Sequence, residues 1–145
     1  MGAPLQLQVA VDRQGLRHAA RALSAWLAAG GIICDAAYGA ELALEEIGSN
    51  LLRHSSPQGT ANWLRIEAEH RGAELELRLL DDGPPFDPTS AAAPDLELPI
   101  GERPIGGLGL LLVRRMAADW SYTRTPEGNR LVCTFKGADG AAPPG

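Results

Sequence analysis

Hydrophobic and polar residues alternate with two different periods along this chain. Some segments repeat every two residues, and others repeat every three to four residues. A period of two residues is typical of a half-buried strand, whereas apolar residues three and four positions apart are typical of an amphipathic helix. The two-residue period predicts strands at residues 5–9, 62–69, 74–80, 120–125 and 130–136. The helical period predicts helices between residues 12 and 30, over 35–54 and over 108–118.

Capping and turn residues predict where several of these elements end. Asp12 is a suitable N-cap for the first helix, and Gly30-Gly31 is expected to end it. Arg71-Gly72 predicts a hairpin turn, and residues 126–129 predict another. Residues 81–105 lack a convincing period and contain six prolines. A loop of this length inside a compact domain is usually functional and often covers a site.

The order of the elements predicts an α+β fold, a two-layer sandwich with helices on one face of a sheet. Strands that pair as hairpins, with enough helices to cover only one face, favour this class over a doubly wound sheet, which needs strict strand–helix alternation. A length of 145 residues suits a single domain, residues 1–145, with one core. The core should extend over about residues 5–136, and the Ala/Gly/Pro-rich residues 137–145 read as a flexible tail.

Composition narrows the classes of function. Charged residues make up 21% and hydrophobic residues 45% of the chain, which is typical of a globular protein. The net charge of −5 argues against a general binder of nucleic acid or anionic membranes, which needs clustered Lys and Arg. No secretory signal or apolar run of ~18 residues is visible, so we expect a cytoplasmic location. Cys34 and Cys133 lack metal-ligand spacing and favour reduced core residues, with a disulfide between them as the alternative.

The first candidate site motif lies on the second predicted helix. Glu46 and Asn50 are four residues apart, so their side chains leave the same face. Magnesium prefers oxygen ligands and keeps several waters, so one amide oxygen such as that of Asn50 can hold it together with nucleotide phosphates. Glu46 is placed to orient or deprotonate a hydroxyl that attacks the terminal phosphate. On this motif alone, a solvated helix face is an equally good interpretation.

The second motif, Asp81-Asp82-Gly83-Pro84, follows the apolar run of residues 75–80. A carboxylate at the end of a buried strand can accept a hydrogen bond from an amino group on a base. Gly83 lacks a Cβ and lets a ring approach the backbone closely. Taken alone, this composition favours a simple turn.

The third motif, Gly106-Gly107-Leu108-Gly109, opens an apolar helical stretch. Backbone N–H groups at a helix start bind phosphate, and small residues let the phosphate approach. The motif is neither a P-loop nor a dinucleotide fingerprint, because no Gly-Lys-Ser/Thr follows and no strand–helix–strand unit surrounds it. The alternative is a hinge for the long loop. Together the three motifs predict a magnesium–nucleotide site.

In this order the three motifs resemble those of the GHKL superfamily, which is shared by gyrase-type ATPases, Hsp90-type chaperones, histidine kinases and MutL-like proteins. The chain is most similar to the small anti-sigma factors that are also serine-protein kinases, the RsbW and SpoIIAB type. Glu-x-x-x-Asn-x-x-x-His at 46–54 matches their N box. Residues 81–88 and 102–110 match their two glycine boxes, and the likeness extends over residues 5–136.

This resemblance implies a role for each candidate residue. Glu46 corresponds to the catalytic base, Asn50 to the magnesium ligand, and Asp81, beside Gly83, to the group that binds the adenine amino group. The phosphates would lie against the backbone of Gly106, Gly107, Leu108 and Gly109. The implied cofactors are ATP or ADP with Mg²⁺, and the implied fold is a mixed sheet covered on one face by helices.

The resemblance also implies partners. Proteins of this type phosphorylate a serine on a STAS-type anti-anti-sigma antagonist and alternately sequester a sigma factor, often as homodimers. No direct contact with nucleic acid or membrane is expected. Ser49 stands where many members carry Thr, and Pro84-Pro85 stands where gyrase-type relatives have a further glycine, which is usual in the small regulatory branch.

Three functions remain open on the sequence. The first is an ATP- and magnesium-dependent protein serine kinase that restrains a sigma factor. The second is a nucleotide-dependent binding module with slow or absent phosphotransfer, and the third is a detached sensor domain with another target. Glu46 favours the first, because binding alone does not require a base at that position.

Overall fold

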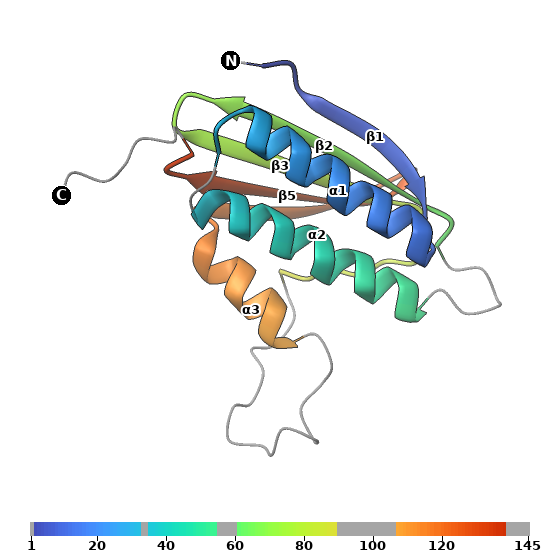
Figure 1. Ribbon diagram of the computed structural model, residues 1–145. Coiled ribbons are helices and arrows are strands. Elements are labelled where there is room, and N and C mark those ends of the chain that lie inside the picture. The colour runs from blue at the N-terminus through green and yellow to red at the C-terminus, as the bar shows by residue number, and fades with distance from the viewer. Residues whose placement is uncertain (1, 33–34, 55–60, 90–106, 139–145) are drawn as a thin grey trace.

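A computed structural model describes residues 2–32, 35–54, 61–89 and 107–138 of the chain. These residues form a five-stranded sheet of order β1-β2-β3-β5-β4 and three helices. Along the chain the elements are β1 (Leu5–Ala10), α1 (Arg13–Ala29), α2 (Asp35–His54), β2 (Trp63–Arg71), β3 (Glu74–Asp81), α3 (Gly107–Met116), β4 (Asp119–Thr125) and β5 (Gly128–Lys136). Figure 1 shows α1 and α2 side by side across one face of the sheet, with α3 next to α2. The predicted α+β two-layer sandwich is confirmed.

The implied mixed sheet is not observed, because all four strand pairings are antiparallel. The reason lies in the order of the last strands. The chain crosses over after β3, so that β4 runs in the same direction as β3, but β5 lies between the two strands. Each of them therefore pairs with β5, and no parallel pair forms among the described strands.

One apolar stripe on each long helix faces the sheet. On α1 the buried positions are Ala19, Leu23 and Leu27, four residues apart, and on α2 a similar stripe runs from Ala36 to Ile47. They pack on the inward side chains of the central strands, among them Ile66, Leu77 and Phe135. At Gly39 the helix lies so close to the sheet that an added Cβ would stand 2.5 Å from the Phe135 ring. This close approach fixes the height of α2, and with it the height of Glu46 and Asn50, above the sheet.

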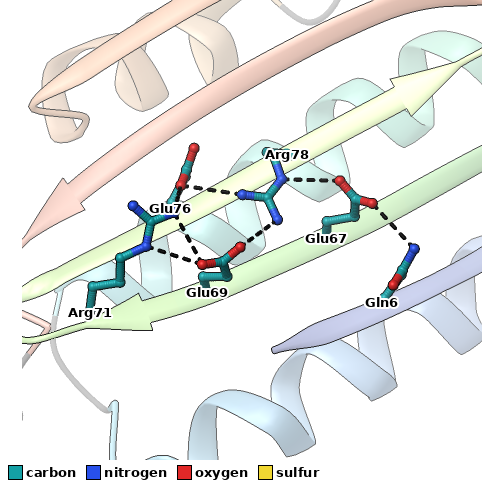
Figure 2. A network of polar contacts seen from close by, with 6 residues as sticks. All are labelled: Gln6, Glu67, Glu69, Arg71, Glu76 and Arg78. Atoms are coloured by element: carbon teal, nitrogen blue, oxygen red, sulfur yellow. Dashed lines mark hydrogen bonds and ion pairs between the residues drawn. The ribbon is translucent and has the colours of Figure 1, made fainter. Parts of the chain in front are cut away.

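The other face of the sheet carries no helix among the described residues. Its side chains on β2 and β3, which alternate with the buried ones, are mostly polar or charged, with Trp63 and Leu80 as the apolar exceptions. Figure 2 shows Arg78 at the centre of this face, with its guanidinium 3.0 Å from Glu67, 2.9 Å from Glu69 and 3.3 Å from Glu76. Arg71 extends the network to Glu69 and Glu76. Charged pairs thus take the place of a second helical layer.

Most predicted element ends agree with the structure. Asp12 caps α1, accepting a 2.6 Å hydrogen bond from the Gly15 N–H, and the helix ends at Gly30. Both hairpin turns differ. The first is Gly72-Ala73, because Arg71, predicted as a turn residue, belongs to β2. The last is only Pro126-Glu127, because Gly128 and Asn129, predicted as turn residues, already belong to β5. Gly128 has a φ of +148°, a conformation that glycine adopts readily, and this lets the strand begin earlier.

Two further findings concern composition. Among the described residues, no helix has the length and apolar character that crossing a membrane requires. Cys133 is a free, buried thiol, and burial raises its pKa to about 12, so it is not a reactive group. The prediction for Cys34 lies outside the described residues.

Candidate functional site

A cavity of about 490 Å³ opens between α2 and one end of the sheet. It is large enough for a small organic ligand. Asn50 from α2 and Asp81 from β3 both line it, so two of the predicted motifs meet in one space although they are distant in sequence. The remaining wall is mostly apolar or aromatic and includes Ile47, Leu51, Ala61, Leu79, Pro84, Pro85, Phe86, Pro88, Tyr122, Asn129 and Leu131.

Asp81 is the last residue of β3 and is almost fully buried, at 5% exposure. Its Oδ1 accepts hydrogen bonds from the Gly83 N–H at 2.8 Å and from the Asn129 side-chain amide at 3.0 Å. Burial raises the pKa of this carboxyl group, while these two hydrogen bonds pull the pKa down. A buried, oriented carboxylate that faces a mostly apolar cavity is expected to accept a hydrogen bond from a polar group on a flat ligand.

Gly83 and Asp82 shape the turn that follows Asp81. Gly83 is buried, and an added Cβ would lie 2.9 Å from Asp81 Oδ1 and 3.4 Å from the Ala61 side chain, so no side chain fits here. Asp82 points the other way and accepts hydrogen bonds from the backbone N–H groups of Asn62, at 2.7 Å, and Trp63, at 3.0 Å. Asp82 therefore ties the end of β3 to the start of β2.

Glu46 contacts the first turn of α3. It leaves α2 one turn before Asn50, and a Cβ built on Gly109 would overlap its carboxylate. Burial raises the pKa of Glu46; the neighbouring Glu45 raises it further, and Arg53 lowers it. The motif on α2 thus connects the cavity, through Asn50, with the N-terminal end of α3, through Glu46.

The glycine-rich motif is placed in part. Gly107 and Gly109 lie in the first turn of α3, and Leu108 between them is 45% exposed, so its side chain faces solvent. The predicted Gly106 lies outside the described residues, as does most of the predicted lid, residues 90–105. A helix N-terminus next to small residues suits an anionic group.

Sequence reasoning missed three residues that organise the site. Asn129 bonds to Asp81, and Tyr122 and Arg124 bond to Asn129. Arg124 also donates a 2.8 Å hydrogen bond to the carbonyl of Gly83. Asn129 is revealed by the pairing of β3 with β5, which places it directly opposite Asp81.

A second cavity of about 500 Å³ lies in the groove between α1 and α2. Leu16, Arg17 and Arg21 line it from α1, and Glu41 and Glu45 from α2. None of the predicted site residues lines it, so the groove is separate from the site described above.

Comparison with known proteins agrees with this geometry. Residues 9–135 match the family described as histidine kinase-like ATPase domain. The chain belongs to this family. The histidine kinase-like ATPase domain implies nucleotide binding, and the GHKL resemblance drawn from the three motifs is confirmed.

The chain is also similar to a named protein kinase. The serine/threonine-protein kinase BtrW of Bordetella bronchiseptica is 29% identical over 97 residues, which cover 67% of this chain and 68% of that protein. By its family the chain is thus a kinase-like ATPase, and it is similar to a protein that is named as a serine/threonine-protein kinase.

Proposed function

We propose that this protein is an ATP- and magnesium-dependent protein serine kinase that also acts as an anti-sigma factor. The observation that carries the proposal is that Asn50 and Asp81 line one cavity while Glu46, one turn from Asn50, contacts Gly109 at the start of α3. This order matches the parts of a nucleotide substrate. Asp81 would lie at the adenine ring, Asn50 at the metal-bridged phosphate chain, and Glu46 at the terminal phosphate as the proton acceptor.

Each residue has a distinct part in binding. Asp81 accepts a hydrogen bond from the adenine amino group, and the absence of a side chain at Gly83 lets the base approach. Asn50 supplies an amide oxygen at the cavity wall. Magnesium would be held by that oxygen together with nucleotide phosphates, and it would neutralise charge on the phosphates. The backbone N–H groups at the start of α3 would bind the phosphates themselves.

Glu46 would carry the chemical step. The Oγ of a substrate serine attacks the terminal phosphorus, the bond from this phosphorus to the bridging oxygen breaks, and ADP leaves. The hydroxyl proton passes to the Glu46 carboxylate. A raised pKa suits this role, because a base is most effective when its pKa lies near the working pH.

The partners belong to the proposal as well. We expect the phosphorylated protein to be a STAS-type anti-anti-sigma antagonist, and the sequestered one to be a sigma factor that binds in alternation with it. The printed name of the Bordetella relative, a serine/threonine-protein kinase, supports the kinase part. The resemblance to anti-sigma factors of the RsbW and SpoIIAB type supports the partner part, and also a homodimer in a cytoplasmic location.

The deciding experiment is transfer of label from ATP to a candidate STAS-type protein, for the wild-type kinase and two variants. Glu46→Gln removes the proposed base, and transfer should fall by roughly 10²–10⁴-fold. Glu41→Gln makes the same chemical change on the same helix at an exposed position and should leave transfer unchanged. Normal transfer by Glu46→Gln would remove Glu46 from the chemistry. ATP binding without any transfer by the wild-type protein would favour a nucleotide-dependent binding module instead.

A further inference from the structure

The side chain of Asn129 uses its full hydrogen-bonding capacity inside the protein. The residue is 7% exposed. Its Nδ2 donates to Asp81 Oδ1 at 3.0 Å and to the Pro84 carbonyl at 2.8 Å. Its Oδ1 accepts from the Phe86 N–H at 3.2 Å, the Tyr122 hydroxyl at 2.5 Å and the Arg124 guanidinium at 3.2 Å.

These partners allow only one orientation of the amide. Rotating it by half a turn would point the NH₂ group at the Phe86 N–H, the Arg124 guanidinium and the Tyr122 hydroxyl, and the carbonyl oxygen at the Asp81 carboxylate and the Pro84 carbonyl. Four of the five contacts would become unfavourable, because an amide oxygen cannot donate and an NH₂ group cannot accept; only the Tyr122 hydroxyl, which can also accept, would tolerate the change. Asn129 therefore always presents a donor to Asp81.

The hydrogen bonds that the described residues make to the Asp81 carboxylate all end on Oδ1. With two N–H donors directed at it, Oδ1 cannot carry a proton without losing one of them. Protonation of Asp81 would consequently occur on Oδ2. We propose that Asn129 is a specificity-determining positioning residue that keeps Oδ2 of Asp81 a pure acceptor, so that the site selects a 6-amino purine over a 6-oxo purine.

The state of Oδ2 decides the choice of base. An ionised Oδ2 accepts from the amino group of adenine and repels the oxo group of hypoxanthine. A protonated Oδ2 becomes a donor, so it loses the amino contact and gains one with the oxo group. The inference rests on the proposed nucleotide site and adds to it a residue outside the three motifs.

Several charged or titratable groups act on Asp81 from the elements around it. From its own strand end, Asp82 raises its pKa, and from β4 Arg124 lowers it. Tyr122 on β4 is the other titratable group of the network, and α2 contributes the neutral Asn50 to the same cavity. Burial is the largest influence and raises the pKa, while the Asn129 hydrogen bond is the strongest opposing one. Removing Asn129 should therefore move the protonation of Asp81 to higher pH.

The test uses two variants of equal shape, Asn129→Thr and Asn129→Val. Both side chains are β-branched and suit a strand, but only threonine carries a hydroxyl that can donate to Asp81. ADP and IDP, which differ in the amino and oxo groups, are titrated into each protein over a range of pH. Asn62→Val serves as the control, because Asn62 donates a similar bond, at 3.0 Å, to the neighbouring carboxylate of Asp82 but does not line the cavity.

We expect Asn129→Val to lose on the order of tenfold in its preference for ADP over IDP, and Asn129→Thr to retain most of it. The pH at which ADP affinity falls should move upward in Asn129→Val and stay unchanged in Asn62→Val. Equal preference and an equal pH midpoint in the valine and threonine variants would overturn the proposal, since shape alone would then account for any loss.

The wild-type protein gives an independent measurement that does not depend on the folding of any variant. Its ADP affinity should fall as the pH is lowered through the pKa of Asp81, while its IDP affinity should not. Parallel curves for the two nucleotides would overturn the proposal but leave the kinase intact. A wild-type protein that binds neither nucleotide would instead defeat the proposed function from which this inference starts.

Discussion

The carboxylate of Glu46 lies against Gly109 so closely that this position has no room for a side chain. The contact joins the middle of α2 to the first turn of α3. It explains why a glycine suits that place better than alanine, although alanine is the better helix former. It also places the third motif in direct contact with the proposed base.

We predict that Gly109→Ala leaves the protein folded but impairs phosphate transfer. The obstructing atoms are the end of a flexible side chain, so the Glu46 carboxylate can move aside, and alanine adds up to about 1 kcal/mol of helix stability. The displaced carboxylate would no longer stand where a base is needed. Thermal unfolding and label transfer measured on the same preparation separate the two effects.

Gly30→Ala is the matched control, because the nearest atom to its added Cβ is 3.5 Å away, at the far end of α1. Transfer should be normal in this variant. A Gly109→Ala protein with wild-type transfer would mean that the contact between Glu46 and Gly109 has no bearing on the chemistry.

The fold was largely predictable from sequence because its elements obey clear local rules. The alternating pattern of β2 and β3 and the apolar stripes of α1 and α2 specify both the type and the buried face of each element. The order of strands was not predictable in the same way. That β5 lies between β3 and β4 depends on pairing between residues about fifty positions apart, such as Asp81 with Asn129.

In the candidate site, too, residues in local motifs were predictable from sequence, and a residue that acts through strand pairing was not. Glu46, Asn50, Asp81 and Gly83 were predicted as candidates because each stands in a local motif. Asn129 was assigned to a turn, since Gly-Asn after Pro-Glu is a common turn composition. The structure places it in β5, where its amide reaches across to Asp81. Its role arises from a contact between strands, which no local pattern contains.

Asp81→Asn should weaken the binding of both ATP and ADP. The change replaces a pure acceptor with an amide that also carries donors, so the contact with the adenine amino group is mismatched. The cost should be on the order of 1–3 kcal/mol of binding free energy, measured by calorimetric titration with ADP.

Asp82→Asn is the control for that measurement. This neighbouring carboxylate accepts its hydrogen bonds from Asn62 and Trp63 and does not line the cavity. Its loss should lower thermal stability and leave nucleotide affinity unchanged. An Asp81→Asn protein that is folded and binds ADP as tightly as Asp82→Asn would exclude Asp81 from the site.

Gly128→Ala should destabilise the protein far more than the same change at Gly72. Both glycines have positive φ, +148° and +56°, so each alanine is conformationally strained. A Cβ at Gly128 would also overlap the backbone carbonyl of Asp81, which cannot move without shifting β3, whereas at Gly72 no atom lies within 4 Å. We expect about 1–2 kcal/mol from strain at Gly72 and clearly more at Gly128.

Denaturant unfolding of the two variants provides the measurement. Nucleotide affinity should fall only in Gly128→Ala, because that clash displaces the strand end that carries Asp81. Equal destabilisation of the two proteins would show that β3 and β5 are not held as closely together at this point as the structure has them.

The pH dependence of transfer tests the surroundings of Glu46. A base acts in its ionised form, so the rate should fall as the pH is lowered through the raised pKa of this carboxyl group. Since Glu45 raises that pKa, Glu45→Gln should move the acid limb of the profile to lower pH. Since Arg53 lowers it, Arg53→Gln should move the limb to higher pH. The two neighbours thus predict shifts of opposite sign around one residue.

The raised pKa of Glu46 also affects the free energy of unfolding. An ionised carboxylate in an ion pair stabilises the folded state, whereas ionisation of Glu46 destabilises it. Because the folded state disfavours the ionised form of Glu46, ionisation opposes folding at pH values above its pKa. Glu46→Gln should therefore unfold at a temperature no lower than the wild-type protein at neutral pH, even as its transfer activity is lost. The pH profiles of transfer and the thermal unfolding of Glu45→Gln, Arg53→Gln and Glu46→Gln together test whether Glu46 is the group that titrates in the reaction. Shifts of the same sign for the first two variants would place the titrating group of the reaction elsewhere.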